Sequence, residues 1–447
     1  MFERICIRLV YPNLSERRYR IVKSLGRFES FSGLLEESGG VGPLSFYIKG
    51  ATLAFALCFL FLPLAAEPAY EISYLLVRSA DGAVLAEHQP DKLRTPASSL
   101  KAVTAAAALE GLGPEREFFT TLVSDGALER GRLKGDLGLK GEADPELTTA
   151  ALKTLVDQLA SQGVRVIEGD LVVDPGPFSF PVYGPGWAWD DAGQDYSPEI
   201  TGLSVNGGLM KLDRGSLPSW VSQTERSGVR LIPGRQGVEV GRELPDEIAI
   251  PRVALRTGQA LAVLLEQQGV RLQGGVRIGT ARGEALATHR SRKLREILKR
   301  ALEVSDNLAM ELVFRACQEQ RPKCLEAEEL RIVDGSGLSR YNLISARQLT
   351  KVLSENPSLK PLLVRPGEGT LKTRFLDGWA ANNVLAKTGS MSNVSALTGF
   401  LFPDSDKECV FAILINGHVG SSSDRKELED RLVEEWARSI GFPYVLK

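Results

Sequence analysis

Histidine and cysteine are scarce in this chain: its 447 residues contain only 3 histidines and 5 cysteines. So few histidines argue against a histidine-rich metal centre. No CxxC, HExxH or GxxxxGK[ST] motif occurs, which excludes thiol-redox, zincin and P-loop chemistry. A strong charge of one sign is also lacking, since 54 basic and 56 acidic residues give a net charge of −2. We therefore expect no cofactor, no metal and no nucleic-acid partner bound through a general basic surface.

What is present is the composition of a folded protein. Hydrophobic residues make up 43% of the chain and charged residues 25%, which are values typical of globular proteins. At roughly 150 residues per domain the length corresponds to about three domain-equivalents. The sequence thus predicts a large globular protein, and if it is an enzyme, one whose catalysis does not depend on histidine.

An apolar run at residues 51–66 is preceded by Lys49 and followed by Glu67 and Pro68. A positive flank, a short hydrophobic region and small residues near a cleavage point are typical of a secretory signal. The run is short for a bilayer span, which needs about 20 residues. We expect a signal peptide at about 44–66, cleaved near Ala66, and an exported protein in the periplasm or another extracytoplasmic compartment. Membrane association would then be peripheral or absent; a buried core helix or an uncleaved anchor is the alternative.

Residues 1–48 carry basic clusters and no clear core pattern. Either they form an unusually long positive region of the signal, or translation starts near Val41 or Leu44. We favour the second interpretation and treat residues 1–66 as a leader region.

Export changes the interpretation of the cysteines. After loss of the leader the chain keeps Cys317, Cys324 and Cys409. An oxidising compartment permits a bridge between Cys317 and Cys324. Three unpaired thiols are the equally open alternative.

The pattern of elements changes twice along the chain. A hairpin at 70–88 and a helix at 95–111, with Thr95 as N-cap, Pro96 at the first helical position and Gly111 at the end, come first. Helical periodicity returns after residue 291, followed by a meander of strands and a final helix near 424–439. Between them, short β-like runs alternate with turns. We expect one split domain at 67–117 and 286–447, and a mainly β inserted domain at 118–285.

The first expected helix carries Ser98 and Lys101, three residues apart and therefore on one face. A serine in the opening turn meets free backbone N–H groups, and a desolvated lysine beside it can act as its general base. The pattern SxxK alone is weak, since on the order of one or two copies arise by chance in a chain of this length. Ser423 and Lys426 form a second copy in a polar loop.

Two further motifs follow in order. Ser305-Asp306-Asn307 lies at a predicted helix–helix junction, where a hydroxyl and a carboxamide could reach into a cleft. Lys387-Thr388-Gly389, followed by Ser390, lies on a predicted strand, which suits extended binding of a peptide carboxylate. Taken singly, Ser305-Asp306-Asn307 is also typical of a helix cap or a turn. Lys387, taken alone, is also typical of an exposed lysine on a strand.

The ordered set SxxK, SDN and KTG resembles the signature of the β-lactamase and penicillin-binding enzymes. Within that superfamily the chain resembles D-alanyl-D-alanine carboxypeptidases of the peptidase S13, penicillin-binding protein 4 type. The resemblance implies an α/β (α+β) fold with an antiparallel sheet flanked by helices. Further matching segments are Thr95-Pro96-Ala97-Ser98, Gly141-Glu142-Ala143-Asp144-Pro145, Pro185-Gly186-Trp187 and Asp334-Gly335-Ser336-Gly337-Leu338-Ser339.

The resemblance also implies roles for individual residues. Ser98 would form an acyl-enzyme on the penultimate D-Ala, Lys101 would take its proton, and Ser305 would relay a proton to the leaving amine. Asn307 would hold the substrate backbone. Lys387 and Thr388 would bind the terminal carboxylate, and Gly389 and Ser390 would belong to the same substrate-binding strand. The N–H groups of Ser98 and Ser390 would form the oxyanion hole.

The implied partners are peptidoglycan stem peptides ending in D-Ala-D-Ala, with β-lactams as covalent inhibitors. The intervals between the three motifs are short for the family. Some members carry an acidic residue shortly before Pro-Gly-Trp, where this chain has Ser179, Pro181, Val182 and Tyr183. A carboxypeptidase with additional endopeptidase activity is the favoured function. A β-lactamase or esterase on the same fold and a non-catalytic peptidoglycan-binding protein are the alternatives.

Overall fold

The computed structural model describes most of the chain after residue 69. The expected leader at 1–66, with its cleavage point near Ala66, lies outside the described residues, as do Ser179 and Cys324. The described residues are 70–176, 181–211, 247–318, 320, 322, 325 and 330–441, together with two short strands at 230–231 and 238–239.

The central element of the split region is an antiparallel five-stranded sheet in the order β16-β17-β18-β1-β2. The first strand of the chain lies in this sheet beside the last one, with Glu71 opposite Asn416. The predicted hairpin and meander are thereby confirmed. The strands are β1 (Glu71–Arg78), β2 (Val84–His88), β16 (Val384–Met391), β17 (Val394–Leu401) and β18 (Cys409–Asn416).

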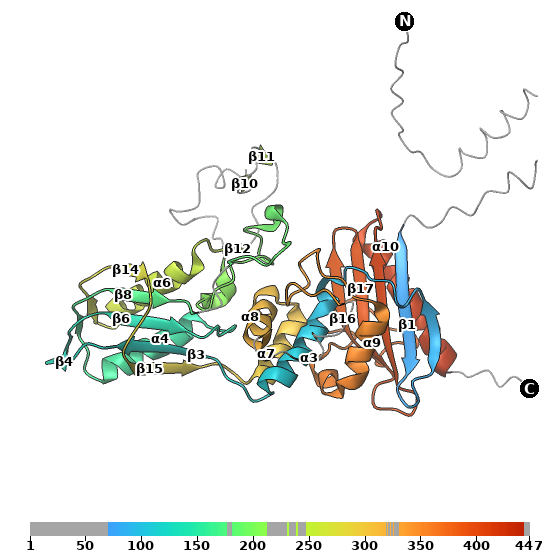
Figure 1. Ribbon diagram of the computed structural model, residues 1–447, viewed down its shortest axis with the longest axis horizontal. Helices are drawn as coiled ribbons and strands as arrows, with labels where there is room; N and C mark the ends of the chain where they lie inside the picture. Colours follow the sequence, from blue (N-terminus) through green and yellow to red (C-terminus); the bar gives the residue numbers. More distant parts are fainter. Residues whose placement is uncertain are drawn as a thin grey trace, which may run out of the picture. The chain divides into compact units, whose positions relative to one another are not determined.

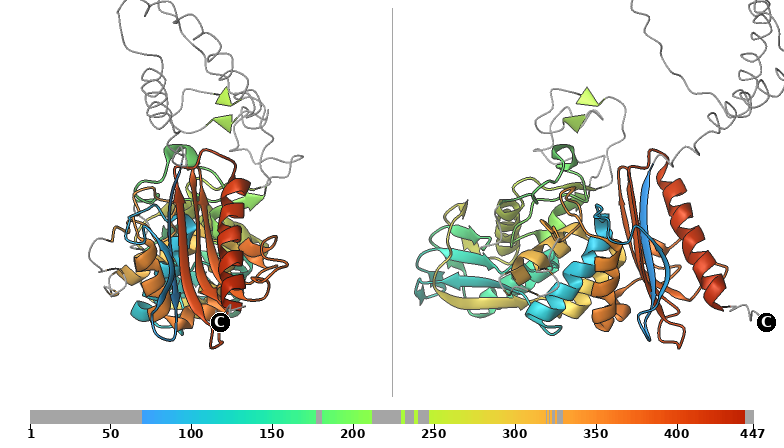
Figure 2. Two further views of the ribbon diagram at one scale, coloured as in Figure 1. Left: turned by 90° about the vertical axis from the view of Figure 1, so that its right-hand side faces the viewer. Right: turned by 45° about the vertical axis from the view of Figure 1, so that its right-hand side comes forward.

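Helices cover both faces of this sheet (Figure 2). Successive side chains of a strand point to opposite faces, so β16 sends Leu385 to one core and Ala386 to the other. The first core contains residues of α3, α7 and α9, and the second contains residues of α10. The helices are α3 (Lys101–Leu112), α7 (Leu294–Val304), α8 (Asn307–Gln318), α9 (Ala346–Glu355) and α10 (Ser422–Gly441), with 3-10 turns η1 (Ala97–Leu100), η5 (Pro357–Leu362) and η6 (Gly369–Leu371).

The first predicted helix is real, but its ends differ from the prediction. It begins as the turn η1 and continues as α3, with Pro96 in the capping position. Thr95 is not the cap, because its backbone N–H and carbonyl are both bound by the side-chain amide of Asn416. The helix runs past Gly111 and ends at Gly113, whose φ of 81° only glycine adopts readily.

Among its described residues, the inserted region contains two larger β-sheets and the helices α4 and α6. Figure 1 shows these elements. The sheets have the orders β14-β8-β6-β3-β15 and β13-β7-β5-β4, and two strand pairs, β9-β12 and β10-β11, accompany them. Because β15 pairs with β3, the inserted sheet extends to Arg290, beyond the boundary expected at 285. We propose that the insert ends at about residue 290. The elements are β3 (Phe119–Ser124), β4 (Leu128–Glu129), β5 (Arg132–Leu133), β6 (Leu137–Gly141), α4 (Thr149–Ser161), β7 (Val166–Ile167), β8 (Leu171–Asp174), η2 (Trp189–Asp191), η3 (Val205–Gly208), β9 (Leu209–Lys211), β10 (Arg230–Leu231), β11 (Val238–Glu239), β12 (Glu247–Ala249), α6 (Val253–Gln267), β13 (Arg271–Leu272), β14 (Val276–Ile278) and β15 (Glu284–Arg290).

The described cysteines are free. Cys317 and Cys409 are both buried and free. Cys324, the partner considered for Cys317, lies outside the described residues, so that bridge stays a prediction. Burial raises the pKa of the Cys317 thiol to about 12, which keeps it protonated and unreactive. Within the described part of the chain, no helix is both long and apolar enough to cross a membrane.

Candidate active site

The backbone around Ser98 is held in an unusual conformation. Ala97, directly before it, has a φ of 48°, a region that residues with a side chain seldom enter. Gly389 of β16 packs against this segment so closely that a Cβ there would lie 2.7 Å from the Pro96 carbonyl oxygen and 3.0 Å from the Ser98 nitrogen. The glycine of the KTG motif is therefore what allows β16 to approach the serine.

Lys101 lies fully buried one turn after Ser98. Its Nζ lies 2.8 Å from Ser98 Oγ, 2.6 Å from Asn307 Oδ1 and 2.6 Å from the carbonyl oxygen of Ser336. The serine–lysine distance is within the range of a nucleophile and its base. The SxxK and SDN motifs are therefore joined by the Lys101 amine, which contacts both Ser98 and Asn307.

The third motif reaches the same place from the sheet. Lys387 is also fully buried, and its Nζ donates to Ser305 Oγ at 3.1 Å and to the Thr388 carbonyl oxygen at 2.9 Å. Ser305 ends α7 in a left-handed conformation with φ of 60°, and Asp306 then caps α8 by accepting from the Ala309 N–H. The sharp turn at the junction is what turns Ser305 towards β16.

Burial controls the charge of both lysines. It lowers the pKa of Lys101 to about 7, against which the carboxylates of Asp334 and Asp306 act to raise it. Burial and the neighbouring Lys101 also lower the pKa of Lys387 well below its usual value. A lysine whose pKa lies near neutrality can accept a proton at neutral pH, which an ordinary surface lysine cannot do.

A pocket of about 450 Å³ opens onto this centre. Ser98, Ser305, Asn307 and Ser390 line its wall, while Lys101 and Lys387 lie buried beneath them. Gly389 packs against the Ser98 segment, and Thr388 is half-buried and does not line the described pocket. The structure therefore brings together all the predicted residues except the Thr388 side chain.

A larger cavity of about 880 Å³ lies elsewhere, between residues 145–148, 206–211 and 289–292 and the junction residues Arg300 and Asp306. Its lining does not include Ser98, Lys101 or Lys387. We assign the active site to the smaller pocket, because that pocket holds the nucleophile and its base.

The residues of the pocket wall that sequence reasoning missed include Asp191, Tyr196 and Arg340. Asp191 lies in η2, after Pro185-Gly186-Trp187, and accepts a hydrogen bond from the Tyr196 hydroxyl at 2.8 Å. The Tyr196 carbonyl in turn accepts from Asn307 Nδ2 at 2.7 Å. The acidic pair directly after the Pro-Gly-Trp segment was the available signal.

The arrangement supplies a nucleophile, a base and a proton-bearing hydroxyl linked to a second amine. These groups suffice for acyl transfer through a covalent serine ester. Among the residues that the structure describes, no cluster of three histidine, cysteine, aspartate or glutamate side chains is placed to hold a metal ion.

Comparison with known proteins identifies relatives over most of the chain. The model of the "D-Ala-D-Ala carboxypeptidase 3 (S13) family" matches residues 65–223 and 238–439. The D-alanyl-D-alanine carboxypeptidase DacB of Haemophilus influenzae is 26% identical, over 78% of this chain and 86% of its own length. The D-alanyl-D-alanine carboxypeptidase of Actinomadura sp. (strain R39) is 30% identical, over 77% of this chain and 78% of its own length.

Solved structures give the same fold. Penicillin-binding protein 4 (dacB) from Haemophilus influenzae superimposes with a TM-score of 0.73, at 24% identity, covering 83% of this chain and 97% of that one. A second structure of that protein, complexed with a β-lactam, gives a TM-score of 0.66 at 21% identity, covering 83% and 96%. The expected α/β fold, with an antiparallel sheet between helices, is confirmed.

Proposed function

The chain belongs to the D-Ala-D-Ala carboxypeptidase 3 (S13) family and is a serine-type D-alanyl-D-alanine carboxypeptidase, and we propose that its acyl-enzyme forms on Ser98. The observation that carries this assignment is the 2.8 Å contact between Ser98 Oγ and the buried amine of Lys101. Ser423, the serine of the second SxxK copy, lies exposed at the start of α10 and does not line the pocket that holds Ser98.

Acylation begins with proton transfer from Ser98 to neutral Lys101. The Ser98 oxygen then attacks the carbonyl carbon of the penultimate D-Ala, and the negative charge develops on the carbonyl oxygen. The backbone N–H groups of Ser98 and Ser390 form the oxyanion hole, since Ser98 and Ser390 both line the pocket and β16 packs against the Ser98 segment.

The leaving D-Ala needs a proton on its nitrogen. Ser305 supplies it, because its hydroxyl is bonded to Lys387 and lines the same pocket as Ser98. Asn307 is bonded to Lys101 and holds the substrate backbone. The proton that Lys101 took from Ser98 replaces the one that Ser305 gave up, so Lys101 is neutral again. Water then attacks the ester with Lys101 as base, and the proton passes to Ser98 as the product acid is released.

The terminal carboxylate of the substrate binds at Lys387, with Thr388 beside it on β16. Both groups that Lys387 contacts, a hydroxyl and a backbone carbonyl, are uncharged. A substrate carboxylate therefore supplies the counter-charge for this buried amine. β16 is the edge strand of the sheet, so an extended peptide can align along it.

The pocket wall also bears on the residue at the third position of the stem peptide. Asp191 and Arg340 place one carboxylate and one guanidinium on the wall that Ser98 shares. A side chain carrying both an ammonium and a carboxylate, such as diaminopimelate, matches these two charges.

The same chemistry extends to two related bonds. A β-lactam presents a strained amide to Ser98 and leaves it acylated, as expected of a penicillin-binding protein. A D-Ala carbonyl joined to the side-chain amine of another stem peptide offers the same scissile group, so endopeptidase cleavage of cross-links is part of the proposal.

Peptidoglycan lies outside the cytoplasm, so the substrate requires an exported enzyme. The apolar run at 51–66 supports a signal peptide cleaved near Ala66 and a periplasmic or other extracytoplasmic location. N-terminal sequencing of the protein isolated from the envelope tests both the cleavage point and the translation start.

The test of the function is labelling with a fluorescent penicillin, followed by release of D-Ala from a purified muropeptide. We expect label on the wild type and on Ser423→Ala, and none on Ser98→Ala. An unlabelled wild type would contradict the acyl-enzyme and favour a non-catalytic binding protein. Rapid turnover of the penicillin without D-Ala release would favour the β-lactamase alternative.

A further inference from the structure

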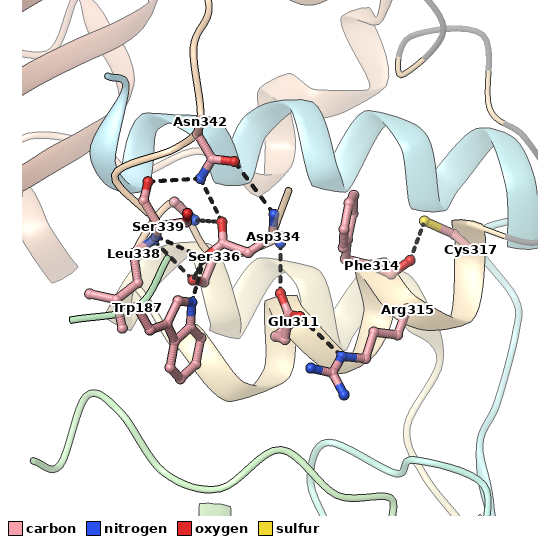
Figure 3. A network of polar contacts seen from close by, with 12 residues as sticks. Trp187, Glu311, Phe314, Arg315, Cys317, Asp334, Ser336, Leu338, Ser339 and Asn342 are labelled. Atoms are coloured by element: carbon pink, nitrogen blue, oxygen red, sulfur yellow. Dashed lines mark hydrogen bonds and ion pairs between the residues drawn. The ribbon is translucent and has the colours of Figure 1, made fainter. Parts of the chain in front are cut away.

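The loop that follows α8 is organised around one buried carboxylate, that of Asp334 (Figure 3). Its Oδ1 accepts from the Gly337 N–H at 2.9 Å and from Asn342 Nδ2 at 2.7 Å. Its Oδ2 accepts from Ser336 Oγ and the Ser339 N–H, both at 2.9 Å, and from the indole N–H of Trp187. In each of these hydrogen bonds Asp334 is the acceptor, so both of its oxygens are held by donors of the chain.

The second side chain on Oδ2 comes from a distant segment. Trp187, of the Pro-Gly-Trp segment that precedes η2, donates its indole N–H to Asp334 at 2.7 Å (Figure 3). The next residues along this segment include Asp191 and Tyr196 of the pocket wall. The pocket wall and the loop are therefore tied together at one carboxylate.

The loop contacts the base and its helix at consecutive residues. The Ser336 carbonyl oxygen accepts from Lys101 Nζ at 2.6 Å, and the Gly335 carbonyl oxygen accepts from Thr104 Oγ1 at 2.7 Å. A Cβ at Gly337 would lie 2.0 Å from the Ala97 carbonyl oxygen. The loop thus reaches the nucleophile's segment and the base within three residues.

A second buried carboxyl touches the loop on its other side. Glu311 of α8 accepts from the Gly335 N–H at 2.7 Å and from Arg315 Nε at 3.0 Å (Figure 3). Burial, together with the nearby Asp334, raises the pKa of Glu311 to about 7. The contacts of Glu311 are made with Gly335 and Arg315 rather than with Lys101, so Glu311 is a matched comparison for Asp334.

We propose that Asp334 is a positioning residue for acylation: its carboxylate holds the loop so that the Ser336 carbonyl stays bonded to Lys101, and it places a negative charge near that lysine. The proposal rests on the proposed function, since it assigns Lys101 as the base. Trp187 completes the same arrangement by holding Asp334 from the pocket-wall side.

The charged groups that act on Lys101 come from two places. Asp334 of the loop and Asp306 of the α7–α8 junction favour its protonated form. Lys101 in turn helps to lower the pKa of Lys387 on β16. Asp334 is the larger of the two carboxylate influences on the Lys101 pKa. Removing its charge therefore shifts the balance towards the neutral amine.

The test is the pH profile of acylation by a fluorescent penicillin, measured for wild type and Asp334→Asn. The neutral form of Lys101 is the active base, so the rate rises with pH through the pKa of Lys101. We expect the midpoint of this rise to move about one pH unit lower in the variant, and the limiting rate to fall about tenfold or more. A lower rate with an unmoved midpoint, or a midpoint moved upward, would overturn the proposal.

Glu311→Gln is the control, because it removes a neighbouring carboxyl but leaves the Asp334 charge in place. We expect its midpoint to stay at the wild-type value. If the rise disappeared in Glu311→Gln, the titrating group would be Glu311 and the proposal would be wrong.

Trp187→Phe keeps the carboxylate and removes one donor to it, which covers the case in which Asp334→Asn does not fold. We expect a several-fold lower limiting rate with the wild-type melting temperature nearly retained. An unchanged rate would refute the positioning role. Failure of wild-type labelling would refute the proposed function itself, which is a separate result.

Discussion

The two faces of the central sheet handle buried charge in opposite ways. On the face covered by α3, the amines of Lys101 and Lys387 contact only uncharged hydroxyl, amide and carbonyl groups. On the face covered by α10, the buried Glu429 carboxylate is paired with Arg374 at 2.9 Å and accepts from Ser395 Oγ at 2.6 Å.

This difference separates reactivity from structure. A buried ion without a charged contact is destabilised, and its pKa moves towards the value at which it loses its charge. Burial also raises the pKa of Glu429 to about 7, but Arg374 acts to lower it, and loss of Glu429 leaves the buried Arg374 unpaired. Substitutions on the α3 face should therefore affect chemistry, and substitutions on the α10 face should affect stability.

The largest expected effect is that of Lys101→Met. Removing the base should lower the rate of penicillin acylation by about 10³-fold, since general-base catalysis contributes about 10²- to 10⁴-fold. The melting temperature should not fall, because an unpaired buried amine is replaced by an apolar chain. Lys153→Met, at an exposed lysine paired with Asp157, should leave the rate unchanged. A rate for Lys101→Met near the wild-type value would remove Lys101 from the mechanism.

Glu429→Ala tests the opposite face. Breaking a buried pair by removing one partner should lower the free energy of unfolding by about 3–5 kcal/mol, measured by denaturant unfolding. The folded fraction should acylate at the wild-type rate. Glu355→Ala, at an exposed residue of α9, is the control and should leave stability unchanged. A catalytic loss in folded Glu429→Ala would erase the distinction between the faces.

Gly389→Ala tests the approach of β16 to the nucleophile. The added methyl group would lie 2.7 Å from the Pro96 carbonyl oxygen and 2.9 Å from the Ser99 nitrogen, so the strand or the serine segment must shift. Acylation should fall about 10- to 100-fold, since small misplacements of reacting groups are costly. Gly275→Ala, where nothing lies within 4 Å of the new Cβ, should behave as wild type.

The smallest expected effect is that of pH on the wild type. The pKa of Lys101 lies at about 7, and only the neutral amine accepts the serine proton. The acylation rate should rise about tenfold between about pH 6 and about pH 8 and then level off. A rate that falls over this range would contradict the role of Lys101 as base.

Most of the fold could be predicted, because the periodicity of its elements is local. The strands of the meander, the helices at 149–161 and 294–304 and the junction at Ser305 all have signals within a few residues. The start of the first helix could not be found in this way. Its first residues depend on Asn416, which only the folded sheet brings to Thr95.

The same limit applies to the site. Ser98, Lys101, Ser305, Asn307 and Lys387 belong to recognisable motifs, and the structure brings them together. Arg340 has no local signal for the chemistry it contributes, and the acidic pair after the Pro-Gly-Trp segment was the only sign of Asp191. That both residues share a wall with Ser98 is visible only in the folded chain. Asp334 lies in a recognised segment, but its five donors come from positions as far apart as Trp187 and Asn342.

The pairing of the first strand with the last has a consequence for synthesis. β1 lies between β2 and β18, so the sheet that carries Lys387 cannot close until residue 416 has been made. Pairing over so long a sequence separation is slow, because a large loop must be closed first. A nascent or truncated chain therefore lacks the assembled centre, and the enzyme gains its activity only when its last strand is in place.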